Sequence, residues 1–129
     1  FDYSYKDYSS IWFSPSQDPH FTSQNTAVQN ELKGSSAIKI GGEYRINRFS
    51  LRGGYQFEES PYQKDIKRGD IIGFSGGFGF NLGSYSLDFS YSRIEQNGEY
   101  QLYNVGLTDA AYINNITNNY TFTVIYEIY

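Results

Sequence analysis

The sequence predicts an all-β protein, an antiparallel up-and-down sheet of about six strands that crosses a membrane as part of a β-barrel. Apolar residues recur at every second position over several strand-length segments, which is the period of side chains along a strand. Aromatic residues make up 19% of the chain while hydrophobic residues total only 39%. Many aromatics with few aliphatics are typical of barrel strands that have a lipid face and a polar lumen face.

The clearest alternation lies in residues 72–91, a predicted hairpin with a tight turn near 83–84. Apolar side chains there alternate with Gly, Ser, Asn and Asp, and the last predicted strand, 119–129, repeats the pattern. Successive side chains of a strand point to opposite faces. We therefore expect one face of these strands to contact lipid, through Ile72, Phe74, Phe78, Phe80, Leu87, Phe89, Phe122, Val124 and Tyr126.

The remaining predicted strands are joined by alternately long and short connections. They cover residues 1–8, 37–46 and 49–58, with a tight turn near 47–48. The long loops are expected at about 9–35, 59–70 and 95–118, with a short helix over 25–32. Outer-membrane barrels have short periplasmic turns and long outer loops. This order therefore predicts the bacterial outer membrane, with membrane lipids and lipopolysaccharide as surroundings.

Charged residues of the predicted central strands lie in the phase opposite to the apolar one, and the apolar face has no charge in any central strand position. A barrel places this phase in its lumen. The predicted lumen-facing charges are Lys39, Glu43, Arg45, Arg52, Glu58 and Asp88.

Several function classes are excluded or disfavoured. The chain has no Cys and a formal net charge of -4, so thiolate metal sites are absent and a nucleic-acid partner is not expected. His20 is the only histidine and lies in a polar loop without an identifiable nucleophile. The glycines of 73–79 lack the lysine and helix of a phosphate-binding loop. We expect no metal, no cofactor and no enzymatic activity.

The predicted loop 95–118 carries apolar residues in an otherwise polar stretch. An exposed apolar patch indicates a partner, so these residues are candidates for capturing a hydrophobic small molecule, although packing among loops would also explain them. The candidates are Leu102, Tyr103, Val105, Leu107 and Ile113.

Four segments resemble the C-terminal part of the FadL/TodX family of outer-membrane transporters of hydrophobic compounds. They are DYSYKDYS (2–9), GGEYRI (41–46), LRGGYQFEESPY (51–62) and QLYNVGLTDAA (101–111). The resemblance implies a fourteen-stranded barrel with an N-terminal hatch, inserted by the barrel-assembly machinery, and passive uptake of hydrophobic molecules. Residues 1–129 would then be the C-terminal portion of this single barrel domain.

Six strands are too few to close, because the smallest membrane barrels have about eight. The other strands would come either from sequence beyond these residues, which is the simpler expectation, or from the assembly of several copies. Two alternatives stay open. One is a barrel that serves as a structural or docking subunit beside other outer-membrane proteins, without transport. The other is a soluble sandwich, which would need a second sheet over the apolar face.

Overall fold

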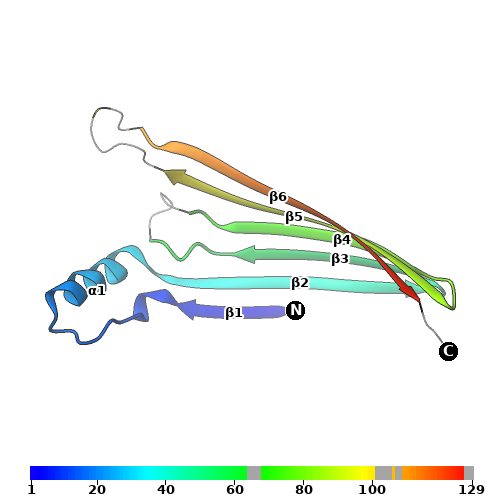
Figure 1. Cartoon of the computed structure of the whole chain (residues 1–129), viewed down its shortest axis with the longest axis horizontal. Coiled ribbons are helices and arrows are strands. Elements are labelled where there is room, and N and C mark those ends of the chain that lie inside the picture. Colours follow the sequence, from blue (N-terminus) through cyan, green and yellow to red (C-terminus); the bar gives the residue numbers. More distant parts are fainter. Residues whose placement is uncertain (64–67, 101–105, 107–108, 127–129) are drawn as a thin grey trace.

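A computed structural model of the chain describes residues 1–63, 68–100, 106 and 109–126. Its strands form one sheet in chain order, and each strand is antiparallel to its neighbours (Figure 1). This confirms the all-β, up-and-down prediction. The elements are β1 (Asp2–Asp7), η1 (Tyr8–Ser10), α1 (Pro19–Glu31), β2 (Gly34–Ile46), β3 (Phe49–Glu58), β4 (Ile71–Asn81), β5 (Tyr85–Tyr100) and β6 (Ala111–Tyr126).

The strand ends that lead into the three long connections lie at one end of the sheet, here called the loop end, and the two tight turns lie at the other, the turn end (Figure 1). The turn between β2 and β3 has Asn47 at φ 52°, and the turn between β4 and β5 has Gly83 at φ 97°. Glycine and asparagine are the residues that adopt this left-handed region most readily. These two residues therefore allow the chain to reverse within a few positions.

Helix α1 begins earlier than the predicted 25–32. Asp18 Oδ1 accepts a hydrogen bond from the backbone N–H of His20 at 2.9 Å, and Pro19 occupies the first helical position. An aspartate cap followed by proline is a strong helix start, because proline has no N–H to leave unpaired. The chain leaves the helix at Leu32 and enters β2 at Gly34.

The prediction of a loop over 95–118 is wrong. Strand β5 continues to Tyr100 and β6 already begins at Ala111, and these two residues pair with each other. Ile113 pairs with Gly98 inside this ladder and is a strand residue, not a loop residue. Polar and apolar residues are mixed on both faces here, so no alternation marked the strands. The other proposed capture residues, Leu102, Tyr103, Val105 and Leu107, lie outside the described residues.

The part of the chain that the structure describes is a single layer without a hydrophobic core, since none of its apolar side chains is buried. The layer is bent. A Cβ added at Gly77 would lie 2.7 Å from the carbonyl oxygen of Phe89 on the neighbouring strand, whereas one added at Gly42, on the opposite face, would meet nothing within 4 Å. The sheet therefore closes on the face that carries Gly77. No helix among the described residues has the length and hydropathy to cross a bilayer.

Candidate functional site

The register sorts the side chains of the sheet into an apolar face and a polar face. One row across β2 to β6 reads Tyr44, Leu51, Phe78, Phe89 and Phe122. Rings within this face are in contact, with centroids 5.5 Å apart for Phe78 and Phe89. All nine residues expected to contact lipid lie on this face.

The apolar residues form a band whose limit toward the loop end differs from strand to strand. The next residue of the same phase beyond that limit is polar, with Ser36 on β2, Glu59 after β3, Asp70 before β4, Arg93 on β5 and Asn118 on β6. The unbroken apolar alternation ends at Tyr5 on β1, Ile38 on β2, Phe57 on β3, Ile72 on β4, Tyr91 on β5 and Tyr120 on β6, and on β6 two separate apolar residues, Ile116 and Tyr112, lie on this face beyond Asn118.

This limit is inclined to the rows of paired residues. Tyr5 is level with Ser36, while Tyr120 is level, through Tyr91, with Gly42, so the limit moves by six residues from β1 to β6. The displacement comes from two steps, two residues between β1 and β2 and four between β4 and β5, because the limits on β2, β3 and β4 lie in one row. At about 3.3 Å per residue and about 4.8 Å between strands, the limit moves about 20 Å along the strands over about 24 Å across them. The apolar band is therefore inclined to the rows by about 40°.

The expectation of an apolar face without charges is wrong for β5. Arg93 and Glu95 lie on the apolar face and form an ion pair just beyond the band. Next to them the Tyr91 hydroxyl donates a hydrogen bond to Asn118 Oδ1 at 2.8 Å. On β5 and β6 the apolar band thus ends at Tyr91 and Tyr120, and polar side chains follow directly beyond these two tyrosines.

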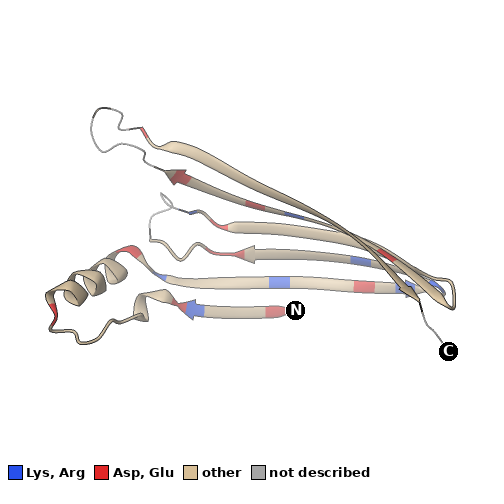
Figure 2. Cartoon of the chain, viewed as in Figure 1, with Lys and Arg blue, Asp and Glu red and all other residues tan. Residues whose placement is uncertain are grey.

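All six charges predicted for the polar face lie on it, and the structure brings four together near the turn end. Glu43 Oε1 lies 2.9 Å from Arg45 Nε and 3.3 Å from Arg52 Nε. Arg52 Nη1 in turn lies 2.5 Å from Asp88 Oδ1. The chain of ion pairs joins β2, β3 and β5 and contains two charges of each sign. Figure 2 shows that most of the length of the strands outside this network carries no charged residue.

The other two predicted charges, Lys39 and Glu58, lie nearer the loop end of the polar face. Both line a small hollow of about 90 Å³ together with Lys6 of β1. They are not part of the four-residue network.

Between these charged regions the polar face is hollowed into a trough. Two adjoining cavities of about 510 and 430 Å³ share Gly41, Gly54, Ser75 and Ser92, which lie in one row across β2 to β5. The small side chains of this row leave the space open. No pattern of reactive residues singled out this row in the sequence, because its common property is small size.

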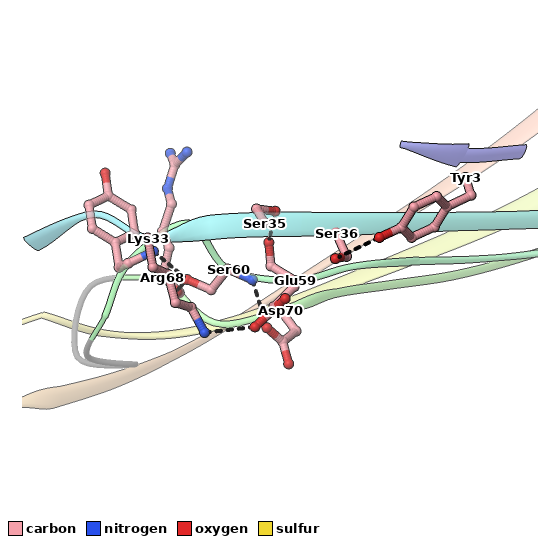
Figure 3. Close-up of polar contacts among 9 residues, drawn as sticks. Tyr3, Lys33, Ser35, Ser36, Glu59, Ser60, Arg68 and Asp70 are labelled. Carbon is pink, nitrogen blue, oxygen red and sulfur yellow. Dashed lines mark hydrogen bonds and ion pairs between the residues drawn. The ribbon is translucent and has the colours of Figure 1, made fainter. Parts of the chain in front are cut away.

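The loop end is held together by polar contacts between the start of β2 and the β3–β4 connection (Figure 3). Ser60 is buried, and its backbone N–H donates to Asp70 Oδ1 at 2.7 Å. Lys33 Nζ lies 2.8 Å from Glu59 Oε1. The hydrogen bond and the charge of this lysine lower the pKa of Glu59.

The described residues contain no group of three or more His, Cys, Asp or Glu placed to hold a metal ion. The ring of His20 lies beside Phe21, with centroids 5.7 Å apart, while its backbone N–H serves the helix cap.

Comparison with protein-family models, with curated proteins and with solved structures gave no match to this chain. The FadL/TodX resemblance therefore rests on the quoted sequence segments alone.

Proposed function

We propose that the chain forms six neighbouring strands in the wall of an outer-membrane β-barrel, and that its polar face lines a passage for hydrophobic small molecules. The inclined apolar band carries this proposal. Strands of membrane barrels are tilted by about 35–45° to the membrane normal, so the membrane plane must cross the rows of paired residues at that same angle. The inclination of about 40° derived from the register agrees with this.

A membrane location also accounts for the absence of a core. In water, an apolar face of this size would have to be covered by a second layer. The described residues provide no such layer. In a bilayer the exposed aromatic face contacts lipid instead, while backbone groups are paired within the sheet.

The trough on the polar face is the candidate passage. The row shared by its two cavities consists of glycine and serine and leaves space for a small molecule, while Lys39, Gln56, Glu43 and Arg52 lie at its sides. The ligand class, fatty-acid-like or aromatic-hydrocarbon-like, comes from the FadL/TodX resemblance. Transport would be diffusive and would need no cofactor.

A second candidate is a structural or docking barrel without transport. The neutral ion-pair network of Glu43, Arg45, Arg52 and Asp88 favours it, because charges that satisfy one another across three strands would also serve to brace a closed lumen.

Uptake by the reconstituted full-length protein separates the two functions. Gly41→Phe places a ring in the trough, and its Cβ would meet only the Gly53 carbonyl oxygen at 3.6 Å. Gly42→Phe places the same ring on the apolar face, where nothing lies within 4 Å. Since the width of a passage limits permeation, we expect Gly41→Phe to reduce uptake of a fluorescent fatty acid several-fold and Gly42→Phe to leave it unchanged.

Equal uptake in both variants would refute the trough as the route. Folded wild-type protein that transports no faster than empty vesicles would favour the docking function.

A further inference from the structure

Among the described residues of helix α1, at the loop end, only Asn25 is buried, with 2% of its surface exposed. Its amide binds a single residue from both sides. Asn25 Oδ1 accepts a hydrogen bond from the backbone N–H of Phe13 at 2.8 Å, and Asn25 Nδ2 donates to the carbonyl oxygen of Phe13 at 3.0 Å. Because the oxygen and the nitrogen of this buried amide both bind the backbone of Phe13, they fix the position of the segment around it.

The fixed segment presents apolar side chains to the outside. Ile11, Trp12 and Phe13 are 42%, 55% and 41% exposed. The segment is held at its other end as well, because the backbone N–H of Ile11 donates to the Tyr8 carbonyl oxygen at 3.4 Å. The Phe13 ring stacks on Phe21 of α1, with centroids 6.2 Å apart. Three exposed apolar residues held in place at both ends indicate a surface with a partner.

The location of this segment identifies the partner. Tyr5 marks the limit of the apolar band on β1, and Trp12 follows seven positions later, at the loop end. Residues 8–17 contain no charged side chain, whereas Thr, Ser, Gln and Asn predominate in α1 just beyond them. Tryptophan is enriched where the hydrocarbon region of a bilayer meets its headgroups.

We infer that the segment Ile11–Phe13 is an interfacial anchor, in which Trp12 lies at the boundary between acyl chains and headgroups and Asn25 acts as its positioning residue. The inference rests on the proposed membrane-barrel function. It adds a lipid-binding role for a loop segment and a structural reason for the buried asparagine of α1.

Trp12 is the only tryptophan of the 129 residues, so its fluorescence reports its depth. The full-length protein, with any tryptophan outside these residues replaced by phenylalanine, is reconstituted into phosphatidylcholine vesicles brominated either near the carbonyls or near the chain ends. We expect the shallow label to quench Trp12 at least about twofold more strongly than the deep label. In the double variant Trp12→Phe, Phe78→Trp, with the reporter in the middle of the apolar band, we expect the order to reverse.

The pair of reporters separates the two claims. Quenching of the Phe78→Trp reporter without quenching of Trp12 would overturn the anchor while leaving the barrel intact. Quenching of neither would overturn both. Quenching of Trp12 by an added brominated fatty acid in unlabelled vesicles, without quenching by brominated lipid, would assign the segment to ligand capture and overturn the anchor.

The role of Asn25 has its own test. Asn25→Ala removes both hydrogen bonds to Phe13, and we expect it to lower the shallow quenching of Trp12 about twofold and to reduce its fluorescence anisotropy. Asn30→Ala, an exposed asparagine on the same helix, serves as the matched control and should change neither. Heat-dependent mobility in gels checks that the barrel remains folded. An unchanged depth profile in folded Asn25→Ala would overturn the positioning role.

Discussion

The inclined apolar band predicts that an arginine lowers the free energy of unfolding by different amounts at two positions of the same register row. Ile46 on β2 is level with Val124 on β6, through Phe49, Phe80 and Leu87. The two side chains are almost equally exposed in the sheet, at 53% and 56%. Any argument from exposure alone therefore expects equal effects of Ile46→Arg and Val124→Arg.

Their expected depths in a bilayer differ. With strands tilted by about 40°, each residue descends about 2.5 Å through an apolar layer about 25 Å thick. Val124 lies four residues below the limit at Tyr120, or about 10 Å deep, close to the middle. Ile46 lies eight residues below Ile38, or about 20 Å deep, near the inner boundary.

Arginine costs about 2–4 kcal/mol at the middle of a bilayer and about 0–1 kcal/mol near its boundaries. Val124→Arg should thus destabilise the folded protein by about 2 kcal/mol more than Ile46→Arg, a factor of about 30 in the folding equilibrium. Urea titration of protein reconstituted in vesicles measures both free energies of unfolding. The threonine variants at the same two positions correct for the lost aliphatic group. Equal arginine costs, or a larger cost at Ile46, would refute the inclined membrane plane.

Two further predictions concern close contacts on the polar face and the pH dependence of the loop end. Gly79→Ala should destabilise the sheet by about 1–3 kcal/mol in the same titration, because its Cβ would lie 2.5 Å from Asp88 Oδ1, whereas Gly42→Ala should be nearly neutral. The ion pair with Lys33 lowers the pKa of Glu59 in the folded state, so its stabilising effect is present above the unfolded pKa of about 4.3 and is lost as the pH falls through the folded pKa. The hydrogen-exchange protection factors of the β3–β4 connection, which correct for the slower intrinsic exchange at lower pH, should therefore fall on acidification in the wild type but show no such pH step in Glu59→Gln.

The alternation of residues predicted those parts of the fold where one face is apolar. Strands β3 and β4 were expected at 49–58 and 72–82, close to their observed bounds, because Phe, Leu, Tyr and Ile recur at every second position there. The polar face followed from the same phase, so its six charges were assigned from the sequence. A period of two is a strong signal only while the two faces differ.

The sequence signal was lost where both faces mix polar and apolar residues. From Arg93 to Tyr100 and from Ala111 to Asn118 the strands are paired through their backbones, and their Asn, Gln, Glu and Thr residues are equally typical of a loop. The clamp at Asn25 was also missed, since an asparagine in a polar helix shows nothing of the peptide it binds. The trough was missed because glycine and serine occur throughout the sequence, and only the strand register shows that four of them lie in one row.

The two faces of the sheet are linked through their glycines. Gly41 and Gly54 open the trough on the polar face, and Gly42 and Gly53, their chain neighbours, remove side chains from the apolar face at the adjacent row. On β2 and β3 these two neighbouring rows carry no side chains, which makes the sheet easy to bend there, since side chains normally resist the crowding of a concave surface. The same residues that widen the polar face thus also permit the curvature that a barrel wall needs. The effect of a substitution on the polar face, such as Gly41→Phe, therefore has to be compared with that of the same substitution at the neighbouring position on the apolar face, Gly42→Phe, before it is assigned to the passage or to the wall.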